Sequence, residues 1–310
     1  MITLINKHAA IILIETLQNQ VVDAWPLINR AQVPIYLDTS PVKWTNFRSL
    51  LNLLEESRDT LPALEFIKLI QNSALKFAEY VHSHIDGEAK SLSVLVEQIP
   101  VRSISVNTTT DKVSIELAIP IEDESLFLAE LYLLAVTHFY LKANQPNLDE
   151  PIQYHLKFPQ AAELNKLQAN SRTPQFLGQN QTAVFYRTTL EFETFNQRYK
   201  KEELSYSQQV LSALEGYIGR ENLTIEQFGE IVGVSERTIQ RHLKSEGMTF
   251  RKIKESLNVA FAKRVMIQRD ASISDVSEHL GYADTSQFIR AFKKSENITP
   301  YQWLKGMRSE

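Results

Sequence analysis

The sequence predicts an α+β N-terminal domain followed by an all-α domain in which two helix-turn-helix units are joined by a long helix. The chain has 310 residues, which is long for a single hydrophobic core. Apolar periodicity alternates between helix and strand patterns in the first 200 residues, but it is purely helical from Gln208 onward. Of the nine glycines, Gly87 and Gly178 precede residue 204 and the other seven follow it.

The N-terminal part begins with helical patterns and continues with strand patterns. Apolar residues at three- and four-residue spacing predict helices, and alternation around a Thr-Thr-Asp-Lys turn predicts a β-hairpin. The expected elements are helices over 9–19, 47–56 and 63–80, a hairpin with Ile104, Val106 and Val113–Ile119, a helix over about 124–142, and strands over 152–158 and 183–188.

Domain boundaries follow from polarity and charge. The polar stretch 195–205 is the expected hinge, so the domains should span 1–198 and 208–310, with a connecting segment over 199–207. Residues 1–204 carry 18 Lys+Arg against 24 Asp+Glu (−6), and residues 205–310 carry 15 against 13 (+2). An acidic domain is therefore joined to a mildly basic one.

Composition and missing signatures exclude several classes of protein. The chain has no cysteine, which excludes disulfides, thiolate metal sites and cysteine nucleophiles, DNA-repair methyl acceptors included, and fits a reducing cytoplasm. The apolar run 9–14 is closed by Glu15, and the run 126–140 is too short to span a bilayer. No P-loop, Rossmann glycine pattern or serine elbow is present. We expect a cytoplasmic chain that is no enzyme and has no cofactor, metal or membrane segment.

The first helix-turn-helix pattern centres on Gly229, Gly233 and Ile239. Such a unit needs a small residue where the second helix crosses the first, and a glycine four residues later to make the turn with positive φ. A branched apolar residue six positions further on anchors the second helix. Ser235 is placed to cap that helix.

The same pattern returns 48 residues later with Ser277, Gly281 and Phe288, although the anchor lies one residue further on. Asp284 is the matching cap. Between the two units, residues 250–269 can form one helix of about 30 Å, comparable to one turn of DNA. This helix should set the second helix of each unit into successive major grooves.

The outward faces of the two second helices carry side chains suited to a major groove. Arginine can bond guanine, glutamine adenine and serine either base, and lysine can bind phosphates. The alternative, that these faces are ordinary solvated surfaces, is much weaker for two matched copies. The expected DNA-binding residues are Ser235, Arg237, Thr238, Gln240, Arg241, Lys244, Thr285, Ser286, Gln287, Arg290, Lys293 and Lys294.

Residues from about 208 to 305 resemble the DNA-binding domain of the AraC/XylS family of bacterial regulators. The resemblance rests on LTIEQFGEIVGVSERTIQRHLKSEGMTF and SISDVSEHLGYADTSQFIRAFKKSENITPYQW. Three positions depart from the family pattern: Ser277 replaces the usual alanine, Asn297 the glycine before the closing proline, and Leu304 the usual arginine. Asn297 tolerates a left-handed conformation, so its turn should survive.

The N-terminal part is weakly similar to the arabinose-binding type of regulatory domain found in some members of that family. This resemblance implies effector sensing, dimerisation or both, but no residue there matches a ligand-binding motif. Glu79, His82, His84 and Asp86 are a metal-site candidate, against the favoured alternative of an ordinary helix end. His155 is better explained as a core or rim residue than as a ligand. The aromatic residues at helical spacing are better explained as core or as a dimer face than as the lining of a pocket: Phe127, Tyr132, Phe139 and Tyr140.

These observations predict a sequence-specific transcription regulator, activator or repressor, controlled by a small-molecule effector at its N-terminal domain. The alternative is the same regulator with an N-terminal domain that only dimerises or binds a protein partner. Its expected partners are double-stranded promoter DNA and a second copy of the chain, with RNA polymerase and a small effector as candidates.

Overall fold

The computed structural model describes residues 1–34, 37–84, 91–160, 173–187, 198–219, 223–269 and 271–307. The chain divides into two compact units. The sheet-bearing unit comprises Thr3–Val33 and Phe47–Glu203. The helical unit comprises Met1–Ile2, Pro34–Asn46 and Leu204–Glu310. The predicted fold class, α+β followed by all-α, is confirmed.

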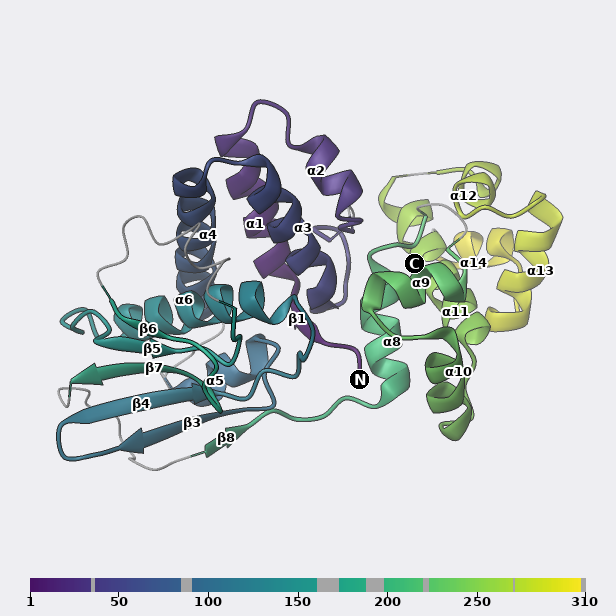
Figure 1. Ribbon diagram of the computed structural model, residues 1–310. Helices are drawn as coiled ribbons and strands as arrows, with labels where there is room; N and C mark the ends of the chain where they lie inside the picture. The colour runs from purple at the N-terminus through teal and green to yellow at the C-terminus, as the bar shows by residue number, and fades with distance from the viewer. Residues whose placement is uncertain are drawn as a thin grey trace. The chain divides into compact units, whose positions relative to one another are not determined.

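The sheet-bearing unit has layers of helices above one sheet (Figure 1). Helix α6 lies between the sheet and the group formed by α1, α3 and α4, with α4 as its main helical neighbour. The helices of this unit are α1 (Lys7–Gln20), α2 (Trp25–Arg30), α3 (Phe47–Thr60), α4 (Ala63–His84), α5 (Leu92–Gln98) and α6 (Leu126–Asn144), and its first strand is β1 (Leu4–Asn6).

The six-stranded sheet has the order β6-β5-β7-β4-β3-β8, in which β5 and β6 are parallel and the other pairs antiparallel. The predicted hairpin is present, with Ile104 opposite Leu117 and Val106 opposite Ile115. The stretch predicted as a hinge contains β8, which pairs with β3. The strands are β3 (Ser103–Thr108), β4 (Lys112–Leu117), β5 (Gln153–His155), β6 (Gln175–Phe176), β7 (Thr182–Arg187) and β8 (Arg198–Lys200).

A buried carboxylate fastens α6 to the sheet. Glu130, which is fully buried, accepts hydrogen bonds from the backbone N–H groups of Lys157 and Phe158 at 2.7 and 3.2 Å and from the Thr182 hydroxyl at 2.5 Å. Burial raises the pKa of Glu130 against the opposing effect of these bonds. Within the described residues α6 is the one helix long and apolar enough to cross a membrane, yet 72% of its most apolar window is buried, as in a core helix.

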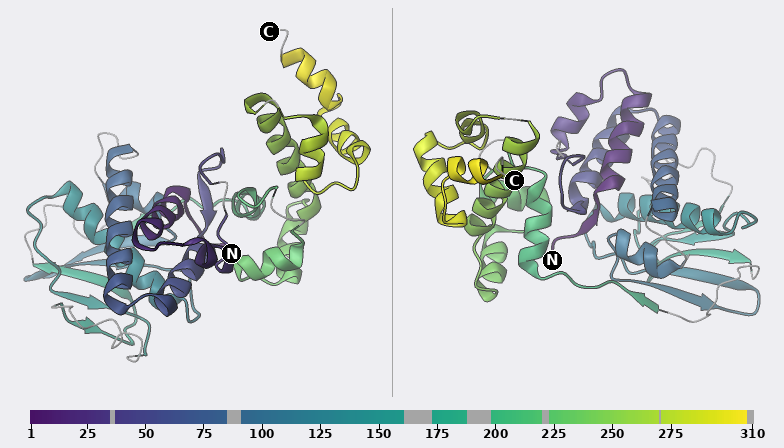
Figure 2. Two further views of the ribbon diagram at one scale, coloured as in Figure 1. Left: turned by 90° about the horizontal axis from the view of Figure 1, so that it is seen from above. Right: turned by 180° about the vertical axis from the view of Figure 1, so that it is seen from behind.

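The helical unit contains seven helices among its described residues after 204. Figure 2 shows this unit from two further sides. Helix α11 contacts α8, α10, α12 and α13, so it lies between the two halves of the unit. Strand β2 (Trp44–Asn46) packs on α8 in the same unit. The helices are α8 (Tyr206–Glu215), α9 (Ile225–Val232), α10 (Glu236–Ser245), α11 (Phe250–Gln268), α12 (Ile273–His279), α13 (Thr285–Glu296) and α14 (Pro300–Met307).

Candidate nucleic-acid interface

Helices α9 and α10 form the first helix-turn-helix. Gly233 ends α9 with φ +67°, in the left-handed region that the turn requires. The next N–H, from Val234, donates to the Gly229 carbonyl at 2.9 Å. A Cβ on Gly229 would lie 2.6 Å from the Val234 carbonyl oxygen, so the crossing of the two helices leaves no room for a side chain. Ile239 is fully buried and anchors α10.

Helices α12 and α13 repeat this geometry with one difference. Gly281 has φ +72°, and the Tyr282 N–H donates to the Ser277 carbonyl at 3.1 Å, as Val234 does to Gly229. The turn is one residue longer, because Ala283 stands between Tyr282 and the cap Asp284. The small-residue position here accepts a serine, which is 2% exposed.

Both second helices begin at the predicted caps. The Ser235 hydroxyl accepts from the Thr238 N–H, and the Asp284 carboxylate accepts from the Gln287 N–H at 2.7 Å. Both cap residues have the extended backbone conformation expected of an N-cap residue. Asn297 closes α13 with φ +62°, which confirms that asparagine can replace glycine there.

The α10 candidates lie on its outward face, but they differ in how free their polar groups are. The Ser235 hydroxyl is 2.9 Å from that of Thr238, and the Gln240 amide donates to Glu236 at 2.6 Å. A bound base would have to displace these local bonds. Arg237 and Arg241 are exposed, and a guanidinium nitrogen of Arg241 lies 3.5 Å from Nε2 of His242. Five of the six α10 candidates are exposed and Thr238 is half-buried: Ser235, Arg237, Thr238, Gln240, Arg241 and Lys244.

On α13 the candidates are again outward, and one lysine has an acidic neighbour. The Lys294 ammonium is 3.9 Å from the Glu255 carboxylate of α11, and Glu255 also pairs with Arg251 at 2.7 Å. Lys294 is thus partly neutralised before any DNA is bound. Thr285 is half-buried and the others are exposed: Thr285, Ser286, Gln287, Arg290, Lys293 and Lys294.

Helix α10 is held from behind by α8. The Glu246 carboxylate, just past α10, accepts from the N–H groups of Tyr206 and Ser207 at 2.7 and 2.8 Å. These bonds lower the pKa of Glu246, with the bonds to Ser207 as the largest cause. The Tyr206 ring also packs on His242, at 4.7 Å between ring centroids. The inner side of α10 is therefore fixed, while its basic face stays free.

Helix α13 is held by aromatic packing and one ion pair. The rings of Phe288 and Phe292, both fully buried, meet edge to face at 5.9 Å, and Trp303 of α14 packs on Phe292 at 6.1 Å. Lys263 of α11 pairs with Glu296 at 2.5 Å. The second unit thus has an aromatic core where the first has aliphatic anchors.

The apolar spacing of α11 predicts an inward face made of Ile253, Leu257, Ala260, Phe261, Val265 and Met266, and the structure differs at Ala260. Ala260, expected inside, is exposed, while Asn258 and Val259 are buried instead. An apolar pattern assigns alanine rather than asparagine to the inward face, whereas in the structure the Asn258 amide is buried.

Residues 34–46 belong to the helical unit, which no local pattern in the sequence indicates. The Asn46 amide, fully buried, donates to the Ile231 carbonyl of α9 at 3.0 Å. The Ser40 hydroxyl donates to the Glu215 carboxylate, which Arg264 also contacts at 3.4 Å. These partners are 185 and 175 residues apart, and local periodicity carries no information at such separations.

Most of the candidate site residues of the sheet-bearing unit are packed against other side chains of that unit. Among the described residues no group of three or more potential ligands could hold a metal ion, and Asp86 lies outside them. His84 instead stacks on Tyr80, at 4.8 Å. Phe127, Tyr132 and Tyr140 are buried in the core, and Phe139 is half-buried.

His155 is a rim residue of the sheet. Its ring packs on Phe185 at 4.4 Å and on Phe176 at 5.5 Å, and it lies 3.0 Å from the Gln153 amide. Desolvation is the largest cause that lowers the pKa of His155. This packing supports the structural interpretation of His155.

The class of module is defined by two helix pairs with matching turns and caps, each with an outward basic helix: a double helix-turn-helix. Residues 228–306 match the family described as a helix-turn-helix domain. The resemblance to AraC/XylS regulators is confirmed for this part of the chain, which is a helix-turn-helix domain of the AraC type.

Curated relatives match about a third of the chain or less. The transcriptional activator AggR of Escherichia coli is 31% identical over 105 residues, which is 34% of this chain and 39% of AggR. The regulator RipA of Corynebacterium glutamicum is 39% identical over 84 residues, 27% of this chain and 25% of RipA. The chain therefore spans well under half the length of these relatives.

Among solved structures, the transcriptional regulator CdpR of Pseudomonas aeruginosa aligns with 91% of this chain and 98% of its own, at 18% identity and a TM-score of 0.35. A second, an AraC-type regulator from Chromobacterium violaceum, aligns with 31% of this chain and 87% of its own, at 26% identity and a TM-score of 0.29.

Proposed function

We propose that this chain is a sequence-specific DNA-binding transcription regulator that acts in the cytoplasm on double-stranded promoter DNA. In this proposal α10 and α13 are the recognition helices, and each enters the major groove of one half-site. The observation that carries it is the pair of exposed basic helix faces, each positioned by a turn glycine, a capping side chain and a buried anchor. The matched relatives are named as transcription regulators, which supports it.

The roles of individual residues follow from their chemistry. Arg241 and Arg290 project from equivalent positions of α10 and α13 and are the candidates for bidentate bonds to guanine. Lys244 and Lys293 are the candidates for phosphate contacts, which add affinity on any sequence. Ser235 and Asp284 act mainly as caps, because their side-chain oxygens accept from the helix backbone.

The test is selection of bound duplexes from a randomised library by the full chain, followed by footprinting. We expect one selected sequence with two protected half-sites about one helical turn apart. The double variant Arg241→Ala, Arg290→Ala should lose the preference for the selected sequence. Lys76→Ala, an exposed lysine of α4, is the control for lost charge. Selection of no sequence, or of a preference that survives the double variant, would contradict the proposal.

We further propose that the sheet-bearing unit controls DNA binding through a small-molecule effector. Its weak resemblance to the arabinose-binding type of domain is the support. The alternative is a unit that only dimerises or binds a protein, RNA polymerase being one candidate. A thermal-shift screen of metabolites distinguishes them, because a ligand that binds the folded state raises the unfolding midpoint. Dimerisation without any such shift would favour the alternative.

A further inference from the structure

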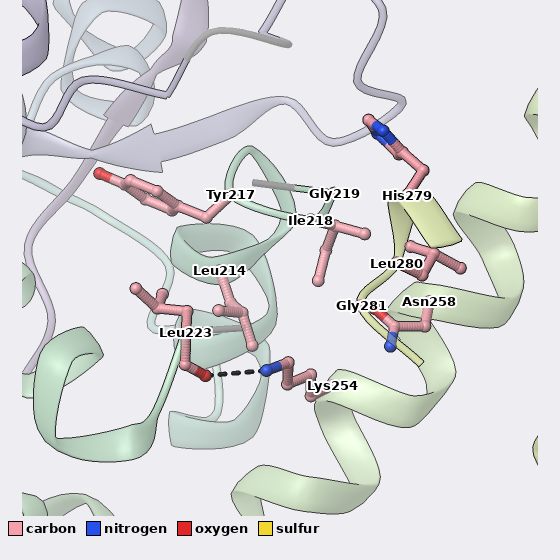
Figure 3. A pocket seen from close by; sticks show the side chains of 10 residues that line it. All are labelled: Leu214, Tyr217, Ile218, Gly219, Leu223, Lys254, Asn258, His279, Leu280 and Gly281. Atoms are coloured by element: carbon pink, nitrogen blue, oxygen red, sulfur yellow. Dashed lines mark hydrogen bonds between the residues drawn. The ribbon is translucent and has the colours of Figure 1, made fainter. Parts of the chain in front are cut away.

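Helix α11 carries two polar residues, Lys254 and Asn258, whose side chains point away from solvent. They are four residues apart and therefore lie on one face of the helix, one turn from each other. Both line a small cavity between the loop after α8, the start of α9 and the end of α12 (Figure 3). This cavity is where the two helix-turn-helix units meet.

Lys254 reaches toward the first unit. Its ammonium donates to the Leu223 carbonyl at 2.8 Å, the bond drawn in Figure 3. Leu223 directly precedes Thr224, the residue that caps α9. The side chain is half-buried, and this burial lowers the pKa of Lys254. Lysine is rarely buried to this extent without a partner, and here its ammonium group donates a charge-assisted hydrogen bond to a backbone carbonyl.

Asn258 reaches toward the second unit. It is 7% exposed, and its amide nitrogen lies 3.5 Å from the hydroxyl of Tyr282. Tyr282 follows the turn glycine Gly281, and its ring meets that of Phe288 edge to face at 5.5 Å. Phe288 is the buried anchor of α13. Asn258 is thus one contact removed from the residue that positions the second recognition helix.

The two halves of the helical unit also touch directly at this junction. Gly219, in the loop after α8, has φ +82°, and a Cβ there would lie 2.4 Å from the ring nitrogen Nε2 of His279. His279 ends α12 and stacks on Phe261 of α11 at 5.4 Å. The contact leaves no space for a side chain, so the loop of the first half packs closely on a helix of the second.

The size of the cavity decides between a ligand site and a packed junction. Its volume of about 30 Å³ is that of roughly one water molecule. Apolar side chains of Leu214, Ile218 and Leu280 line much of it. A junction this full holds its helices in one arrangement, because packed interiors resist small displacements.

We propose that Lys254 and Asn258 are positioning residues that fix the distance and angle between α10 and α13. The chain then binds two half-sites tightly at one separation only. This inference rests on the proposed function, since it concerns how that DNA is recognised. One base pair added between half-sites moves the second site by about 3.4 Å and turns it by roughly 35°, and a rigid junction cannot follow.

The experiment compares spacing preference in full-length variants, with the duplex selected by the wild-type chain and the same duplex lengthened or shortened by one base pair between half-sites. The wild type should bind the altered duplexes about tenfold or more less tightly, the loss expected when one helix loses its base contacts. In the double variant Lys254→Met, Asn258→Leu, the ratio of the affinities for the selected and the altered duplexes should fall to about threefold. The second helix can then adjust its position. Affinity for a duplex with one half-site should stay unchanged.

Matched variants separate positioning from charge and from folding. Lys252→Met removes an exposed lysine of the same helix and should keep the wild-type spacing ratio. Lys254→Arg keeps a donor and should also keep it. The single variants Lys254→Met and Asn258→Leu, checked for a cooperative thermal transition, serve if the double variant does not fold.

The outcomes distinguish this inference from the function on which it rests. A folded Lys254→Met or Asn258→Leu chain with the wild-type ratio would overturn the positioning role and leave the proposed function intact. Loss of affinity on single half-sites and altered duplexes alike would also overturn it, as a merely structural effect. A wild-type chain that selects no sequence would overturn the proposed function and this inference with it.

Discussion

The two helix-turn-helix units solve the same packing problem with different residues. In the first, Gly229 is required because a Cβ would collide with the Val234 carbonyl oxygen. In the second, Ser277 occupies the equivalent position in a turn that is one residue longer. The hydrogen bond from the turn to this residue is kept in both, at 2.9 and 3.1 Å. The hydrogen bond of the turn is thus common to both units, whereas the turn length and the residue at the crossing differ.

The largest expected effect tests this difference at Gly229. In Gly229→Ala the new methyl group must push the turn away, which should cost about 2–3 kcal/mol of unfolding free energy despite the better helix propensity of alanine. Urea unfolding of the full chain measures the loss. Hydrogen exchange at the Val234 amide should speed up as its bond to residue 229 weakens. A wild-type midpoint would show that the first unit tolerates a Cβ as the second does.

The next effect compares the two recognition helices by their arginines. Arg241→Ala and Arg290→Ala should each weaken binding to the selected sequence by about 1–3 kcal/mol, and each should relax base preference in one half-site only. Titrations on duplexes mutated in either half-site measure this. Equal losses on selected and random DNA would mean that the arginines contact phosphates instead.

A smaller effect distinguishes the lysines at the ends of these helices. Lys244→Ala should reduce the slope of log affinity against log salt by about 1, as expected for one lost phosphate contact. Lys294→Ala should reduce it less, because Glu255 lies 3.9 Å from Lys294 and already offsets part of its charge. Affinities at several salt concentrations give both slopes. If Lys294→Ala had the larger effect, the acidic neighbour would not matter in the complex.

The smallest effect has the opposite sign to the first. The Ser277 hydroxyl is buried and has no hydrogen-bond partner among the described residues. Ser277→Ala removes this buried polar group, so it should stabilise the chain by up to about 1 kcal/mol. A shift of the thermal midpoint to higher temperature checks this. A loss of stability would indicate that the hydroxyl is hydrogen-bonded in solution.

Alanine at two equivalent positions is therefore expected to act in opposite directions. That contrast depends on tertiary contacts, although both positions belong to a pattern visible in the sequence. The glycine of the first turn and the serine of the second carry the same sequence-level label of small residue. They differ because a Cβ on residue 229 would lie 2.6 Å from the Val234 carbonyl oxygen, which is too close for any side chain.

The sequence by itself determined the elements whose causes are local. Gly233 and Gly281 have the positive φ that their turns require, and Ser235 and Asp284 cap the helices that follow. These features depend on a few neighbouring residues, so pattern and spacing were sufficient to predict them. The hairpin and the helix α11 between the two units followed from periodicity for the same reason.

Only the tertiary structure decided which distant segments meet. Nothing near Asn46 in sequence indicates that its amide bonds Ile231, and nothing near Lys254 or Asn258 indicates that they face inward. Such polar residues on a helix are ordinarily solvated, and burial becomes favourable only where folding supplies a partner. The sequence thus defined two recognition units, and long-range hydrogen bonds decided how they are joined.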